Sequence, residues 1–333
     1  MSDKVHVKHG DGGKYTNQLI KDMFYDVLKT PLEEQGKDSA VLELPFQKIA
    51  YTTDSFVVKP IFFKGGNIGK LAVCGTLNDL AVSGAKPLYM SLAMIIEEGF
   101  DIEMLKKIVK SIEETCVSQG VKIVTGDTKV VERGSADEIF INTSGIGSII
   151  NDYSEKLIQP GDEVIITGGI GEHGAAIALD RYDLNIDGNI KSDCAPVFPM
   201  IKRIEDSFEV IKLMKDPTRG GIASVLNEIA QKNKVGIELI EENIPISNEV
   251  NGIAKLLGFD PLYLACEGRI LLVVQEGRGE NIVRKIRAAD TGREAKLIGK
   301  ITKNDEGLVF MKTRIGGKRM IYMLEAPMLP RIC

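Results

Sequence analysis

The sequence predicts a two-domain α/β protein, on three observations. At 333 residues the chain has room for two domains of about 150 residues each. Segments with helical spacing of apolar residues alternate with short runs of β-branched residues, as in α/β folds. A polar segment at 151–162, which contains Pro160 and Gly161, interrupts this alternation near the middle of the chain. We therefore expect an N-terminal domain over 1–153, a C-terminal domain over 154–325 and a tail over 326–333.

Composition favours a soluble, cytoplasmic protein. Apolar residues make up 44% and charged residues 27%, proportions that are ordinary for a globular protein. The formal net charge is −5 without a run of Lys or Arg, which argues against nucleic acid or an anionic membrane as a partner. No apolar stretch approaches the roughly 20 residues of a membrane-spanning helix, and residues 1–10 lack the apolar region of a signal peptide.

The five cysteines are scattered singly, which argues against a disulfide framework and against paired metal ligands. They are Cys74, Cys116, Cys194, Cys266 and Cys333. Three of them lie in apolar surroundings and are expected in the core. Cys333 differs because it is the last residue.

Helices and strands are predicted in turn along the first half. The glycine-rich residues 9–14 come first, and Gly12 and Gly13 could let the backbone approach an anion, although such a run more often forms a mobile arm. The predicted elements are a helix over 15–28, a strand over 51–58, a helix from about 68, a strand over 88–96, a helix over 102–119 and strands over 121–125 and 139–150.

Three acids interrupt apolar segments of this half. Asp54 lies within the strand YTTDSFVV, Asp79 near the end of the following helix, and Asp127 after the strand VKIVTG. An unpaired acid is costly to bury, so such residues are normally paired, hydrogen-bonded or bound to a metal. Asp79 and Asp127 could instead cap local turns. Together the three acids favour a site for magnesium and a phosphorylated ligand.

The second half continues with strands over 163–167, 270–275, 297–301, 307–311 and 320–324 and helices over 223–232, 249–257 and 280–289. Residues 169–174, GIGEHG, match a dinucleotide-binding turn, but no buried strand follows the helix, so we do not favour that interpretation. GGNIGKL at 65–71 lacks the spacing and the Ser or Thr of a P-loop. His173 has no second ligand at metal spacing and is expected to be structural.

The segment DPTRGG at 216–221 is the strongest phosphate-site candidate in this half. Asp216 adds a fourth acid, Thr218 could cap the helix that follows, and Gly220 and Gly221 open the backbone. We expect Asp54, Asp79, Asp127 and Asp216 to hold magnesium together.

Two further segments leave alternatives open. Glu267, before a buried strand, could be a catalytic carboxylate, although a salt bridge with Arg269 is favoured by spacing alone. The tail APMLPRIC is stiffened by Pro327 and Pro330, so it either carries its terminal thiol into a pocket or frays.

Several of these segments together resemble the HypE family of hydrogenase maturation proteins, within the aminoimidazole ribonucleotide synthetase superfamily. The resemblance covers almost the whole chain in order and is most specific at the terminal PRIC. It rests on the segment at 52–92, IVTGDTKVVERG, FINTSGIG, DPTRGG and PRIC. One departure is FFKGG, where relatives usually have a proline, so that Lys64 leaves the rigidity of this loop open.

The resemblance implies a dimer whose N-terminal domains form a β-barrel core flanked by helices, with a C-terminal α/β domain and ATP in the cleft between domains. It implies that HypF carbamoylates Cys333, that ATP and Mg²⁺ drive dehydration to a thiocyanate, and that the cyano group passes to iron held by HypC and HypD. It implies Lys129 and Glu267 as bases for the two amide protons. We also expect Arg331 to favour the Cys333 thiolate and the terminal carboxylate to oppose it.

Two other functions are compatible with the chain. One is a small-molecule ATP enzyme of the same superfamily, such as selenophosphate synthetase, which needs a reactive Cys near the N-terminus, whereas the first here is Cys74. The other is a non-catalytic assembly factor with a docking tail. ATP hydrolysis that depends on a carbamoylated tail would separate a dehydratase from a docking factor.

Overall fold

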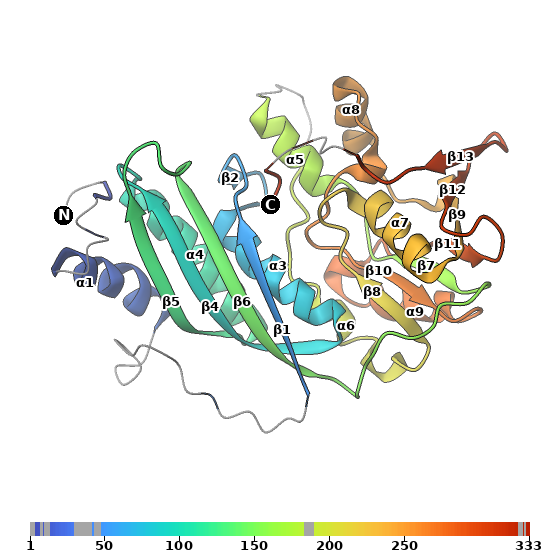
Figure 1. Ribbon diagram of the computed structural model, residues 1–333, viewed down its shortest axis with the longest axis horizontal. Helices are drawn as coiled ribbons and strands as arrows, with labels where there is room; N and C mark the ends of the chain where they lie inside the picture. The colour runs from blue at the N-terminus through green and yellow to red at the C-terminus, as the bar shows by residue number, and fades with distance from the viewer. Residues whose placement is uncertain are drawn as a thin grey trace.

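The protein is built around two β-sheets that lie side by side in the computed structural model (Figure 1). The structure describes residues 4–6, 9, 14–29, 42, 48–182, 190–325, 329 and 331–333. The first sheet has four strands and the second has seven, and β2 (Phe62–Phe63) pairs with β3 (Gly66–Asn67) in a small hairpin. Within the described residues no helix has the length and apolar character to cross a membrane.

The first sheet has the strand order β1-β6-β4-β5. Its strands are β1 (Ile49–Phe56), β4 (Ala85–Glu97), β5 (Lys122–Val131) and β6 (Ile139–Ile149). β6 pairs antiparallel with β1 and β4, whereas β4 and β5 are parallel and are joined by the helix α4 (Ile102–Gln119). A parallel pair needs such a crossover, because its strands begin at the same end of the sheet.

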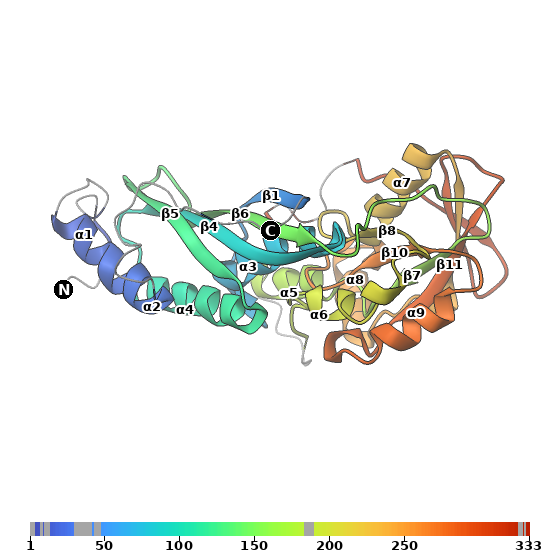
Figure 2. The same ribbon diagram turned by 90° about the horizontal axis from the view of Figure 1, so that it is seen from below.

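One face of this sheet is covered by α3 (Ile68–Val82) and α4 (Figure 2). α3 begins at Asn67, whose side chain accepts hydrogen bonds from the backbone of Gly69 and Lys70. Thirteen of its residues are buried, and only Lys70 and Asp79 are not. The other face of the sheet carries large exposed side chains, with Tyr51 at 66% exposure. Among the described residues no strand pairs with the outer edges of β1 and β5, so the described part of one chain does not close the expected barrel.

The second sheet has the strand order β13-β12-β9-β11-β7-β10-β8, and only β9 and β12 are parallel neighbours. Its strands are β7 (Glu163–Ile166), β8 (Ile211–Lys215), β9 (Gly236–Ile240), β10 (Leu271–Val274), β11 (Lys296–Thr302), β12 (Val309–Lys312) and β13 (Lys318–Ile321). Val164 and Ile166 of β7 pack into the core on the α7 side, whereas Ile165 packs into the core of α9. Helices on both faces explain why a strand such as β10, with the sequence LLVV, is apolar throughout.

The helices of this half are α5 (Glu172–Arg181), α6 (Phe198–Ile201), α7 (Gly221–Asn233), α8 (Asn248–Leu257) and α9 (Gly279–Ile286). Short 3-10 turns lie at Glu205–Ser207, Glu241–Asn243, Pro261–Tyr263 and Asp290–Gly292. The N-terminal helix comprises α1 (Lys14–Ile20), a π-helical turn (Lys21–Tyr25) and α2 (Asp26–Leu28).

The alternation of helices and strands predicted an α/β class, and the two-part α/β architecture is confirmed. The sheets are mostly antiparallel, which makes the arrangement α+β. β7 has antiparallel neighbours on both sides, so the GIGEHG segment after it is not a dinucleotide-binding turn, which needs parallel strands. β8 and β9 were not predicted, because five residues are too few to show a clear periodic pattern.

Candidate active site

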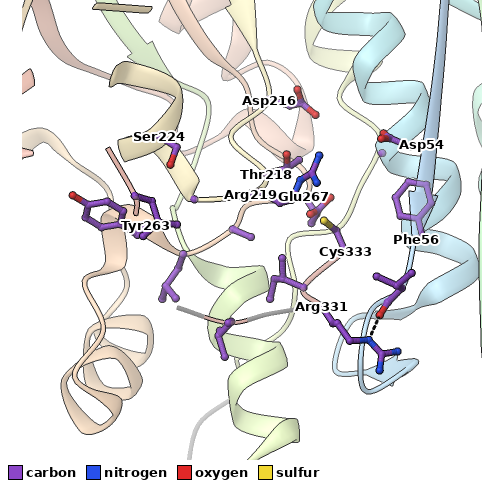
Figure 3. A pocket seen from close by; sticks show the side chains of 18 of the residues that line it. Asp54, Phe56, Asp216, Thr218, Arg219, Ser224, Tyr263, Glu267, Arg331 and Cys333 are labelled. Carbon is purple, nitrogen blue, oxygen red and sulfur yellow. Dashed lines mark hydrogen bonds between the residues drawn. The ribbon is translucent and has the colours of Figure 1, made fainter. Parts of the chain in front are cut away.

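A cleft of about 690 Å³ lies between the two halves of the molecule (Figure 3). β1 and α3 contribute one wall, and the segments before α7 and before β10 contribute the other. The last residues of the chain lie in it as well, and the C-terminus is close to the centre of the molecule in Figure 1. The cleft is thus lined by segments from both halves of the chain and by its C-terminal residues.

Three acids line this cleft: Asp54 on β1, Asp79 on α3 and Asp216 after β8. Asp79 accepts a hydrogen bond of 2.7 Å from the Thr52 hydroxyl. Burial and the neighbouring Asp79 raise the pKa of Asp54 to about 6 and that of Asp216 to about 7. Two carboxyl groups whose pKa values are raised by burial and by a third carboxylate form a site that attracts a cation.

These acids fit a magnesium ion that is also bound by phosphate oxygens. Among the described residues, no three Asp, Glu, His or Cys groups are placed to hold a metal ion by themselves. Magnesium usually keeps several waters and uses one or two carboxylates together with substrate phosphates. The capping alternative for Asp79 is wrong, because Asp79 lies inside α3, whose N-cap is Asn67.

The N-terminus of α7 opens onto the same cleft through Thr218, Arg219 and Gly220. Gly220 and Gly221 have φ values of 74° and 56°, in the left-handed region that glycine tolerates. A Cβ at Gly220 would lie 2.0 Å from the Ser224 hydroxyl oxygen. Such a glycine-opened helix start suits an anion. Thr218 does not cap α7 as expected, because the N-cap is Gly220 and has no side-chain cap.

Glu267 is a buried acid, 2% exposed, and its Oε1 has no hydrogen-bond partner among the described residues. Burial, reinforced by surrounding acidic groups, raises its pKa well above the ordinary value. The favoured salt bridge with Arg269 is wrong. Arg269 instead donates to Glu172 at 2.5 Å, because the chain bends at Glu267 and Gly268 and separates the two side chains. Glu267 therefore lines the cleft with one carboxyl oxygen that no described residue pairs with.

The tail pairs with the segment after β1. The backbone N–H of Val57 donates to the carbonyl of Cys333 at 3.1 Å, and that of Lys59 donates to the carbonyl of Arg331 at 3.2 Å. The Arg331 side chain donates to the Val57 carbonyl at 2.9 Å and forms an ion pair with Asp137. In the described tail residues, the frayed-end alternative is therefore wrong. Pro327 and Pro330 lie outside the described residues.

Two side chains of α5 hold the tail backbone from the other side. His173 is fully buried, and its Nε2 lies 2.8 Å from the carbonyl oxygen of Ile332. Its Nδ1 lies 2.7 Å from the Ser192 hydroxyl. Arg181 donates to the carbonyl of Arg331 at 2.7 Å. His173 is structural as predicted, but what it supports is the tail.

The Cys333 sulfur lies beside Glu267 in the cleft (Figure 3). Burial, followed by the charge of Glu267, raises the pKa of the Cys333 thiol to about 12, and Arg219 offsets only part of this rise. The expectation that Arg331 favours the thiolate is wrong for this docked tail, because Arg331 is engaged by Asp137. Docked in the cleft, Cys333 is a neutral thiol.

Asp127 and Lys129 lie elsewhere in the chain. Both belong to the edge strand β5 and pair with each other at 2.9 Å. They align with Ala93 and Ile95 on the uncovered face of the first sheet. Asp54 lies on the opposite face, toward α3 and the cleft. One chain therefore does not bring Asp127 or Lys129 to the other three acids. Gly12 and Gly13 fall outside the described residues.

The loop that contains Lys64 is tied down on both sides. Its backbone N–H donates to the Asp180 carboxylate at 2.9 Å, and its carbonyl accepts from the Ser192 N–H at 2.8 Å. Proline at this position would lack the donated N–H. Hydrogen bonds to the second half therefore hold this loop without a proline.

Residues 36–149 match the N-terminal domain of AIR synthase related proteins, and residues 159–312 match the C-terminal domain of the same proteins. With its two sheets and the cleft between them, the chain belongs to the AIR synthase related family.

More specific relatives are the carbamoyl dehydratases named HypE. The HypE of Rhodobacter capsulatus is 43% identical over 99% of this chain and 98% of its own length. A crystal structure of hydrogenase maturation protein HypE in complex with ATP covers 99% of this chain and 100% of its own, with 39% identity and a TM-score of 0.94. A chain from a HypE–HypF complex is 45% identical, with a TM-score of 0.81, and covers 92% of this chain and 99% of its own. Within the AIR synthase related family, the chain belongs to the HypE group.

Proposed function

We propose that this protein is an ATP-dependent carbamoyl dehydratase that acts on its own C-terminal cysteine and supplies the cyano ligand for the iron of [NiFe]-hydrogenase. The observation that carries the proposal is the position of Cys333, whose side chain lies in the same cleft as Asp54, Asp79, Asp216 and Glu267. The carbamoyl dehydratase relatives and the ATP complex of a similar protein support the reaction.

The reaction begins with a carbamoyl group on the Cys333 sulfur. Its amide oxygen attacks the γ-phosphorus of ATP, the bond from phosphorus to the bridging oxygen breaks, and ADP leaves. One amide proton is lost as the carbon–nitrogen double bond forms. Loss of the second proton and departure of phosphate then give the thiocyanate. The net change converts S–CO–NH₂ and ATP into S–CN, ADP and phosphate, so phosphorylation turns a poor leaving group into a good one.

The acids and the α7 N-terminus serve nucleotide binding in this scheme. Thr218, Gly220 and Gly221 bind phosphate oxygens through the helix start, and Gly12 and Gly13 are proposed to add backbone contacts. Asp54, Asp79 and Asp216 hold magnesium, which would neutralise charge on the transferred phosphate. The raised pKa values of Asp54 and Asp216, and the position of all three acids in one cleft, support this assignment.

Glu267 is proposed as an acid–base group for the amide. Within the described part of the chain its Oε1 has no hydrogen-bond partner, and the carboxyl group lies beside the Cys333 thiol. A carboxyl group whose pKa is raised well above its ordinary value can take a proton from nitrogen and return it to a departing oxygen. The docked Cys333 thiol is neutral, and its sulfur is also uncharged once it is carbamoylated. The surroundings that keep the thiol neutral therefore suit the carbamoylated tail as well.

We infer a homodimer that uses the uncovered face of the first sheet. Tyr51, Ile49 and Ile95 expose 66%, 47% and 43% of their surface there, and large apolar side chains exposed on one sheet face mark an interaction surface. Asp127 and Lys129 lie on this same face. We propose that they complete the cleft of the partner subunit, Asp127 toward magnesium and Lys129 as the second base.

The carbamoyl donor is proposed to be HypF, on the basis of the HypE–HypF complex of a similar chain, and the acceptor of the cyano group a HypC–HypD complex. We propose that the reactions take place in the cytoplasm. We also propose domain limits at 1–153 and 154–325, with a tail at 326–333. Because the docked thiol is partly buried in the cleft, we propose that the tail leaves the cleft to meet either partner.

Mass spectrometry of the C-terminal peptide tests the proposal. After incubation with the carbamoylating partner, the peptide gains the mass of a carbamoyl group, and addition of ATP and Mg²⁺ then removes the mass of one water. Cys333→Ala should bind ATP but show neither change. A carbamoyl adduct on Cys333→Ala, or ADP formation without loss of water from the wild-type peptide, would overturn the proposal.

A further inference from the structure

Asn78 is a buried carboxamide that joins the two halves of the molecule beside the cleft. It is 2% exposed and lies in α3, immediately before Asp79. Its Nδ2 donates to the carbonyl oxygens of Glu267 and Ala195, both at 3.1 Å. Its Oδ1 accepts from the backbone N–H of Val197 at 2.8 Å. Every one of these bonds crosses from the first half to the second.

The carboxamide is matched to its partners atom by atom. An Asn side chain offers two N–H donors and an oxygen acceptor, and the two carbonyls and one N–H use all of them. Asp has the same shape but no donor for the two carbonyls, and Leu has neither donor nor acceptor. Only an amide at this length can satisfy all three backbone groups.

Asp193 holds the same short segment from the other side. Its carboxylate accepts from the backbone N–H groups of Glu267 at 3.1 Å and Gly268 at 3.3 Å. The Asp193 side chain is fully buried and lies 3.5 Å from Arg269 Nε. The backbone of Glu267 is thus fixed at both its N–H and its carbonyl, while its Oε1 has no hydrogen-bond partner among the described residues.

We propose that Asn78 is a positioning residue that sets the distance between the nucleotide-binding acids and Glu267. Asp79 and Asn78 are neighbours on one rigid helix, so the helix that presents the acid to the cleft also holds the backbone of Glu267. Phosphoryl transfer to the amide oxygen and proton removal from its nitrogen occur on one small group. The nucleotide-binding acids and Glu267 must therefore both be correctly placed relative to that group. The inference rests on the proposed dehydratase function.

The test compares Asn78→Ala with Asn67→Ala, which removes the N-cap of the same helix but makes no bond to Glu267. Asn78→Ala should keep its Mg-ATP affinity within a few-fold of wild type, because the three acids remain. The single-turnover rate of thiocyanate formation should fall by about 10²-fold, the usual cost of a misplacement near 1 Å. Its pH–rate profile should shift, because the surroundings of Glu267 change. Asn67→Ala should lose stability but keep the rate and the profile.

Amide hydrogen exchange over residues 265–269 gives a readout that needs no turnover. Exchange there should be faster in Asn78→Ala and unchanged in Asn67→Ala. Equal rates, pH profiles and exchange in the two variants would overturn the positioning role. If wild type itself forms no thiocyanate, the proposed function fails, and hydrogen exchange still decides whether Asn78 positions Glu267. Asn78→Ser, which keeps one donor, replaces Asn78→Ala if the latter does not fold.

Discussion

His173 Nε2 lies 2.8 Å from the carbonyl oxygen of Ile332, the residue before the terminal cysteine. Burial lowers the pKa of His173, so the imidazole is neutral, with Nε2 donating to the tail and Nδ1 accepting from Ser192. The Ser192 hydroxyl donates to Nδ1 and so fixes the ring proton on Nε2, where it donates to the tail.

Removing this contact should release the tail. For His173→Ala we expect Cys333 to react about fivefold faster with a thiol reagent, since one hydrogen bond contributes about 1 kcal/mol. The measurement is labelling of the C-terminal peptide under native conditions. Cys333→Ala supplies the background, because the other four cysteines are buried. An unchanged labelling rate would remove His173 from tail docking.

The acids of the cleft should make the nucleotide-free protein less stable as pH rises. The pKa values of Asp54 and Asp216 are raised to about 6 and about 7, so the folded state holds more protons than the unfolded state above their ordinary pKa. By linkage, the free energy of unfolding falls as pH rises from about 4 to about 7. His173 acts in the opposite sense, because its lowered pKa costs stability as pH falls below about 6.5.

Asp216→Asn separates these contributions. The variant cannot ionise, so its stability should depend less on pH between 5 and 8 and should exceed that of wild type at pH 8. Its affinity for Mg-ATP should fall. Denaturant titrations at pH 5 and pH 8 measure the free energy of unfolding of the wild type and the variant. Lys212→Gln, which changes a charge on the preceding strand, is the control. A steeper dependence on pH in Asp216→Asn would contradict the raised pKa.

Asp137 should stabilise the docked tail, and this stabilisation should weaken as the salt concentration rises. It pairs with Arg331 of the tail, and the two side chains are 35% and 33% exposed. A pair of this exposure contributes about 0.2–1 kcal/mol, so Asp137→Asn should raise Cys333 labelling by less than about fivefold. The effect should shrink in high salt, which already screens the wild-type pair. Asp152→Asn breaks another ion pair, with Lys48, and should leave labelling unchanged; an equal rise in both variants would exclude a specific role for Asp137.

Residues in unusual local surroundings were predictable from the sequence. Asp54 and Asp79 are acids in apolar segments, Asp216 begins the glycine-containing segment DPTRGG, and Cys333 is a terminal thiol, so each was singled out without knowledge of its neighbours. The helix α4 was predicted at its observed ends, 102–119, and in the structure Asp101 caps its start and Gly120 ends it.

Contacts between distant segments were not predictable. His173 meets a residue 159 positions away, and Arg331 meets Asp137 across 194 positions, distances at which periodicity carries no information. Asn78 could have been noticed as a polar residue inside an apolar helix beside Asp79, but its partners lie in the other half. The pairing of Glu267 with Arg269 was wrong for the same reason, since Glu172 and Asp193 reach Arg269 from remote segments.

Glu267→Gln should separate nucleotide binding from dehydration. The amide keeps the shape of the carboxyl group but can neither take nor return a proton, so Mg-ATP affinity should stay near that of wild type. The rate of thiocyanate formation should fall by about 10²–10⁴-fold, the range for loss of a general acid–base group. Calorimetry and single-turnover mass spectrometry measure the two quantities. Glu228→Gln, which also lines the cleft, is the matched control, and equal rates in both variants would exclude Glu267.

Lys129 should act on the tail of the other subunit. It lies on the uncovered face of the first sheet, whereas Cys333 lies in the cleft on the covered side. Lys129→Ala and Cys333→Ala should each be inactive alone. When the two are mixed and subunits exchange, a heterodimer pairs an intact tail from the first with an intact lysine from the second, so thiocyanate should form.

The product should appear only on the subunit that carries Lys129→Ala, and its yield should follow the fraction of heterodimer measured by native mass spectrometry. Lys122→Ala, a change on the same strand, is the control and should be active alone. Activity of Lys129→Ala by itself would show that the lysine is not a base. Inactive mixtures in which heterodimers are demonstrably present would show that Lys129 does not act across the dimer.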